Sequence, residues 1–116
     1  MKTYNEQPDE AKQTYAAFLV KGDSMSDETR NGFEDGSKIM TVVMSINDLK
    51  DAVSKNPAEL WVIEVGNSIL FRQIILYDQV NNTIVCHPLN ADYKDTIIDL
   101  ANISKVYKVV NKIVSY

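Results

Sequence analysis

Apolar residues in this chain fall in short runs separated by glycine, asparagine or proline. Runs of this length that are rich in β-branched and aromatic residues are typical of strands. Two of them are separated only by Gly66 and Asn67, and this pair predicts a tight hairpin turn. The pattern predicts strands over 15–21, 38–44, 60–65, 68–77, 83–89, 96–100 and 103–114.

One segment follows a helical pattern instead. Ser45 or Asn47 offers an N-terminal cap, and Leu49 and Val53 share one face of the helix predicted over 45–56. We expect this helix on the surface between strands. The sequence therefore predicts a mostly β domain of several short antiparallel strands with one short helix.

Residues 1–14 are polar and show no periodicity, so they are predicted to form a linker or arm ahead of one domain over 15–116. The composition is 45% hydrophobic and 24% charged, which is typical of a globular protein. A net charge of −4 argues against a surface that binds nucleic acid. The chain has one cysteine and no apolar stretch long enough to span a bilayer, which predicts a cytoplasmic protein that does not enter membranes.

Candidate chemistry begins at the end of the first predicted strand. An apolar run leads to Lys21 and Gly22, and Ser24 follows directly after the break. Glycine suits a turn that needs a positive φ. On these residues alone, the pattern fits either an exposed nucleophile or a plain strand end with a serine in a polar turn.

Three motifs in the same order resemble the LexA-like family of self-cleaving repressors and mutagenesis proteins, which are related to signal peptidases. The first is Gly-Asp-Ser-Met over 22–25, and the second is the hairpin over 59–65 and 67–74. The third, over 83–93, is similar to the family's Asn-Pro-x-Tyr corner, although alanine or aspartate stands near the usual proline. The resemblance runs from about Phe18 to the C-terminus and implies a LexA/signal-peptidase-like β-fold.

The resemblance implies that Ser24 is the catalytic nucleophile and that the backbone amides of Asp23 and Ser24 form an oxyanion hole. It places Arg72 where the family has its catalytic lysine. Lowering a lysine pKa from ~10.4 to about 7 costs roughly 4 to 5 kcal/mol, whereas arginine would need roughly 7 to 9 kcal/mol. A small domain has only ~5 to 15 kcal/mol of stability. Arg72 is therefore predicted to stay charged and to donate to Ser24, a backbone carbonyl or a carboxylate such as Asp23 or Asp35, or else to point outward.

Other residues could in principle supply a base. Lys21 and Lys38 flank the serine turn but are expected to be solvated. Cys86 and His87 are adjacent on a strand and must face opposite ways, which predicts a buried free thiol and a surface histidine. The sequence predicts no metal site and no cofactor, because one cysteine and one histidine provide too few ligands.

Three functions remain open at this point. The first is a regulatory, dimerising domain of a LexA-like or phage-type repressor of the SOS type, with self-cleavage lost because of Arg72. Its homodimer would form through the apolar strand from Ile103, at Val106, Val109 and Val110. DNA would be bound only through an upstream domain that this chain lacks, and a protein activator is a further expected partner.

The second function is an active self-processing serine peptidase that uses Ser24 with another lysine. That family cleaves Ala-Gly or Cys-Gly bonds, and neither dipeptide is in this chain. The third is an unrelated small β-barrel binding module, in which Ser24 and Arg72 would lie far apart.

Overall fold

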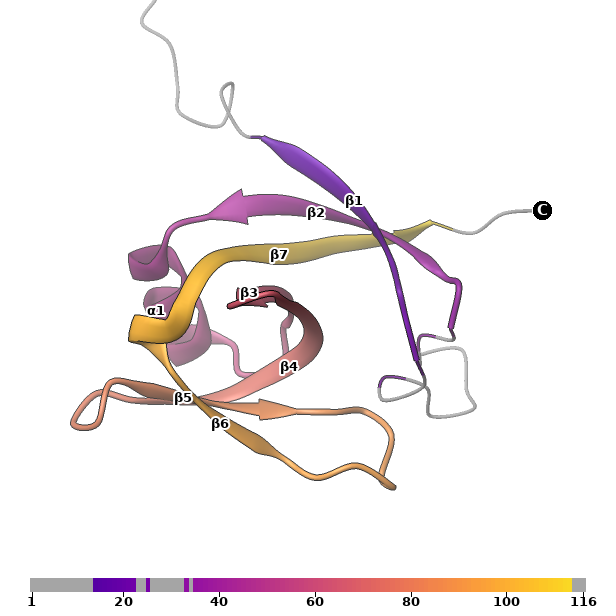
Figure 1. Cartoon of the computed structure of the whole chain (residues 1–116). Coiled ribbons are helices and arrows are strands. Elements are labelled where there is room, and N and C mark those ends of the chain that lie inside the picture. The colour runs from indigo at the N-terminus through magenta and orange to yellow at the C-terminus, as the bar shows by residue number, and fades with distance from the viewer. Residues whose placement is uncertain (1–13, 23–24, 26–32, 34, 114–116) are drawn as a thin grey trace, which may run out of the picture.

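The computed structural model describes residues 14–22, 25, 33 and 35–113 (Figure 1). All strand pairs within these ranges are antiparallel, so the predicted mostly β fold with one short helix is confirmed. A single α-helix is found in the same ranges, together with one 3-10 turn. The elements are β1 (Tyr15–Leu19), β2 (Lys38–Met44), α1 (Ile46–Lys55), β3 (Leu60–Val65), β4 (Ser68–Asp78), β5 (Thr83–His87), β6 (Thr96–Asp99), η2 (Leu100–Asn102) and β7 (Ile103–Ile113).

The strands form one curled sheet in the order β1-β2-β7-β3-β4-β5-β6. The last strand in the sequence therefore lies between β2 and β3, and Tyr107 is opposite Val43 on one side and Val62 on the other. Figure 1 shows β7 running beside β2, with the β5 and β6 strands at the far side of the curl. Strands far apart in sequence are joined in this way through β7.

The prediction that the strand from Ile103 is an apolar edge available for a dimer is wrong for residues 103–108, which lie between β2 and β3. β7 pairs with β3 only as far as Lys108 and with β2 as far as Ile113, so residues 109–113 pair with β2 alone. Val106 is 1% exposed and belongs to the core. A valine-rich alternating strand has the same pattern at an edge and in the interior, so the sequence could not distinguish the two positions.

β7 does not divide into two regular sides, because it contains bulges. Val109 pairs with Thr41 and Asn111 pairs with Met40, so that Val110 has no opposite residue in β2. A bulge shifts the alternation of side chains. For this reason Lys108 and Lys112 lie on opposite faces, since their β2 partners are three residues apart.

The helix α1 begins where its sequence predicts. The Ser45 side chain accepts the Asp48 N–H at 3.0 Å, and the Asp48 carboxylate accepts the Ser45 N–H at 3.4 Å. This reciprocal arrangement is a capping box. Leu49 and Val53 are buried, so the helix covers one face of the sheet with its apolar side rather than lying wholly on the surface.

The hairpin between β3 and β4 closes at Gly66, whose φ is +58°. A positive φ at the first turn position suits glycine and explains the predicted Gly-Asn turn. β5 ends at His87, two residues before the predicted end, because Pro88 has no N–H for a ladder.

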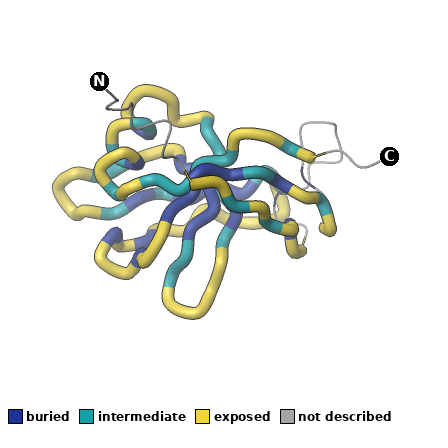
Figure 2. The backbone as a smooth tube through the Cα atoms, turned by 90° about the horizontal axis from the view of Figure 1, so that it is seen from above, coloured by how far each residue is buried: buried dark blue, intermediate teal, exposed yellow. Residues whose placement is uncertain are grey.

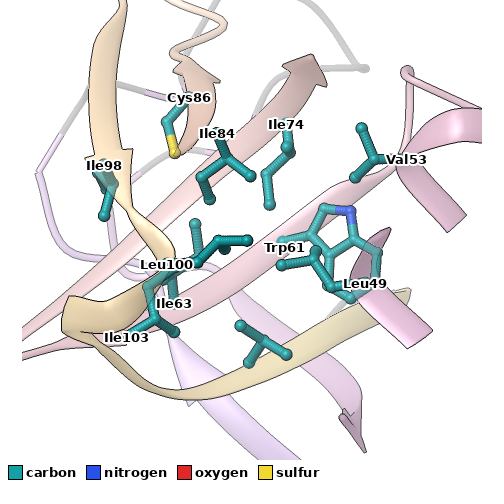
Figure 3. Packing of buried hydrophobic residues seen from close by; sticks show 11 residues of the cluster. Leu49, Val53, Trp61, Ile63, Ile74, Ile84, Cys86, Ile98, Leu100 and Ile103 are labelled. Atoms are coloured by element: carbon teal, nitrogen blue, oxygen red, sulfur yellow. The ribbon is translucent and has the colours of Figure 1, made fainter. Parts of the chain in front are cut away.

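Buried side chains form two clusters on opposite faces of the central strands. Trp61 and Ile63 point into the first cluster with α1 (Figure 3), and Val62 points into the second with Phe71. Figure 2 shows the buried stretches concentrated along the central strands and the exposed ones at the turns. Trp61 and Phe71 thus both anchor the hairpin in the core, from opposite faces.

Candidate functional site

A groove of about 690 Å³ lies on the face of the second cluster, between β1 with the residues that follow it and the first half of β4. Val20, Met25, Val62 and Phe71 contribute its apolar lining. Lys21 and Arg72 are the charged residues among the described lining, and both are cationic. The groove therefore combines an apolar floor with positive charge.

Unpaired strand edges border this groove on both sides. β1 is the first strand of the sheet and pairs only with β2 among the described strands. On β4, the pairing with β5 starts at Gln73, so residues 68–72 pair with β3 alone. Unpaired backbone groups are the usual template for adding an extended polypeptide.

Aromatic packing fixes the walls of the groove. Phe18 and Tyr107 meet edge to face with ring centroids 4.8 Å apart, and Phe33 and Phe71 do so at 4.9 Å. The Tyr107 hydroxyl donates to Glu64 at 2.5 Å, which joins β7 to β3. Burial, and then the hydrogen bond to Glu64, raise the pKa of Tyr107 to about 12. No sequence motif links these two residues, which are 43 positions apart in the chain.

The Arg72 guanidinium forms a hydrogen bond within its own strand. Its Nη1 donates to the Phe71 carbonyl at 2.7 Å. This matches the backbone-carbonyl role that was one of the predicted alternatives. Burial lowers the pKa of Arg72, and electrostatic interactions with Cys86 and Tyr93 oppose that shift. The side chain is therefore half enclosed and held at the border of the groove.

The predicted nucleophile Ser24 and the predicted oxyanion-hole residue Asp23 lie outside the described residues. Their neighbours on both sides, Lys21 and Met25, line the same groove as Arg72. Gly22 has φ +81°, as predicted for this turn, and its N–H donates to the Asp35 carboxylate at 2.8 Å. Among the described residues, no atom outside the adjacent ones lies within 4 Å of the place of a Gly22 side chain. The positive φ is thus the observed reason for a glycine here.

The two alternative lysines are both exposed. Lys21 borders the groove and Lys38 begins β2, and neither is buried. A lysine must be desolvated to act as a neutral base at ordinary pH. Their positions thus favour solvated charges over a relocated dyad.

The Cys86 and His87 pair is arranged as predicted. Cys86 is a free thiol buried in the first cluster, and burial raises its pKa to about 12. His87 is half exposed on the other face, with Nδ1 2.6 Å from the Asp95 carboxylate. Asp95 was missed by sequence reasoning, because the loop that returns it to His87 has no recognisable signature. Over the ranges that the structure covers, no three metal-ligating side chains come together.

The corner over 83–93 brings one further aromatic residue to the site. Its chain turns at Asn90, whose carbonyl accepts the Tyr93 N–H at 3.1 Å and whose side chain accepts the Asp92 N–H at 2.9 Å. Tyr93 then interacts electrostatically with Arg72.

No helix within the described part of the chain is long and apolar enough to cross a lipid bilayer. No protein-family model and no curated protein sequence matches this chain.

Proposed function

We propose that this protein is the regulatory domain of a LexA-like repressor that holds an extended polypeptide in the groove without cleaving it. The proposal is carried by the position of Arg72. This residue lines the same groove as Met25, which follows the predicted nucleophile Ser24, and Lys21, which lies three residues before it.

The chemistry of this arrangement is binding without proton transfer. A serine attacks only after a base removes its proton. A guanidinium has a much higher pKa than an ammonium and keeps its proton in proteins. Arg72 also donates to the Phe71 carbonyl, which holds the guanidinium at its own strand. An arginine at this position therefore stabilises the edge of β4 and leaves Ser24 without a base.

The groove itself suits an extended segment. Its border has unpaired backbone on β1 and on residues 68–72 of β4, and its floor is apolar. A dimer of such a repressor domain would have to form without Val106, because that side chain is in the core.

A fluorophosphonate probe, which labels activated serines, tests the proposal without any need for the natural substrate. We expect no Ser24-dependent labelling and no self-cleavage of the unaltered protein at alkaline pH. The Arg72→Lys variant should gain labelling at Ser24, and adding Ser24→Ala to that variant should remove it.

Two results would count against the proposal in different ways. Labelling of the unaltered protein at Ser24 would mean an active peptidase. A folded Arg72→Lys variant that remains unlabelled would mean that the serine and the β4 residue do not form a dyad site, as expected for an unrelated binding module.

A further inference from the structure

A second surface, on the face of β4, β5 and β6 opposite to the first core cluster, is apolar without being covered. Leu76 pairs with Val85, and Val85 pairs with Ile97, so that the three side chains form one row across three strands. Leu76 is 54% exposed and Ile97 is 70% exposed. Ile74 and Ile84 on the same strands point into the core, which confirms that the row faces outward.

A bulge in β4 enlarges this row. Ile74 pairs with Cys86 and Leu76 pairs with Val85, which leaves Ile75 without an opposite residue in β5. The bulge turns two consecutive apolar residues outward, since Ile75 is exposed as well as Leu76. Single exposed apolar residues are ordinary, but a contiguous row usually marks an interaction site.

Acidic residues lie on both sides of Ile97, at the β6 end of the row. His87 is two residues from Val85 and so lies on the same face, and it contacts the Asp95 carboxylate at 2.6 Å. Asp99 lies two residues after Ile97 and pairs with Thr83. Asp99 also accepts the Ala101 N–H at 2.9 Å. A carboxylate accepts several hydrogen bonds, so both aspartates keep capacity for a cation.

β6 is also the last strand of the sheet, and among the described strands it pairs only with β5. We propose that this edge binds an extended segment of another protein in which an apolar residue is flanked, two positions away on each side, by lysine or arginine. Such a segment would add antiparallel to β6. Its apolar residue would extend the row beside Ile97, and its two cations would lie beside Asp95 and Asp99.

The two carboxylates favour a basic segment over a second copy of this chain, nucleic acid or an anionic lipid surface. In a symmetric pairing of two copies centred on Ile97, Asp95 of each copy would lie opposite Asp99 of the other, and like charges directly opposite are destabilising. Nucleic acid and anionic lipid surfaces would be repelled by the same carboxylates. The lysine or arginine side chains of a basic partner would instead form ion pairs with Asp95 and Asp99.

The probe is the peptide acetyl-Thr-Lys-Thr-Val-Thr-Lys-Thr-amide. It is titrated into the isotope-labelled protein, and binding is followed through the backbone amide chemical shifts of the protein. We expect saturable shifts centred on Ile97 and Ile98, and much smaller ones in β1. Asp95→Asn with Asp99→Asn should weaken binding about two- to thirty-fold, the range for two exposed ion pairs. Asparagine can still cap η2 and still bond His87, so this variant removes charge and little else.

Ile97→Thr should weaken binding too, whereas Val110→Thr, at a half-exposed position on β7, should not. A control peptide with glutamate in place of both lysines should give no β6 shifts. The proposal is overturned if the peptide shifts no β6 amide at millimolar concentration, or if the double asparagine variant binds as well as the unaltered protein. Equal binding of the glutamate peptide would equally reject it.

Discussion

The interior position of β7 can be tested with one pair of valine substitutions. Val106 is 1% exposed in the first core cluster, while Val110 is 50% exposed at a bulge of the same strand. Val106→Ala removes the equivalent of two methylene groups at ~0.8 kcal/mol each, and the cavity left behind brings the loss to about 2 to 3 kcal/mol. Val110→Ala should change the free energy of unfolding by no more than about 0.5 kcal/mol.

Urea unfolding followed by Trp61 fluorescence measures the difference. Trp61 is the only tryptophan of the chain and is fully buried, so its emission reports loss of the core. With a slope of about 1 to 3 kcal/mol per molar urea, the midpoint for Val106→Ala should fall by roughly 0.7 to 3 M. Sedimentation of both variants should show the same mass as the unaltered protein.

The reasoning is refuted if Val110→Ala destabilises as much as Val106→Ala. It is also refuted if Val106→Ala keeps full stability but lowers the sedimenting mass, because that result would place β7 at an intermolecular edge.

Three further predictions concern the core and the helix. Cys86 should react with a thiol reagent in the folded protein only at the rate of unfolding, and in urea it should react at once; rapid labelling under native conditions would contradict its burial. Folding raises the pKa of Cys86 from 9.0 and of Tyr107 from 10.0, each to about 12. The stability that these two protonated groups contribute is therefore complete below about pH 9, and it is lost as the pH rises toward 12. The urea midpoint should therefore fall between pH 8 and pH 11, and it should fall less in Cys86→Ala; a flat profile would contradict the shifts. Ser45→Ala removes the cap that accepts the Asp48 N–H and should cost about 0.5 to 2 kcal/mol, with Ser45→Asp close to neutral as the control in the same urea assay.

Local features of this fold were predictable because each depends on a few neighbouring residues. The turn at Gly66 and Asn67 needs only a positive φ, and the start of α1 needs only Ser45 with Asp48 three residues later. The opposite orientations of Cys86 and His87 follow from the two-residue period of a strand. These features are present in the structure as the sequence predicts them.

Features that depend on strand order were not predictable in this way. Nothing in the apolar pattern of β7 specifies β2 and β3 as its two neighbours, and the bulge at Val110 has no signature residue. The contact of Asp95 with His87 likewise depends on the path of the loop between β5 and β6. At the candidate site, the sequence indicated Arg72 and the turn at Gly22, but the partner carbonyl of Phe71 became visible only in the structure.

The place of β7 also has a consequence for synthesis on the ribosome. β2 and β3 pair with β7 and not with each other, so the two parts of the sheet have no common hydrogen-bonded ladder until residues 103–113 leave the exit tunnel. Until then the nascent chain presents two open interior edges, of the kind that recruit chaperones or aggregate. Translation that stops before this last strand should yield fragments for the cell's proteases rather than a smaller folded domain.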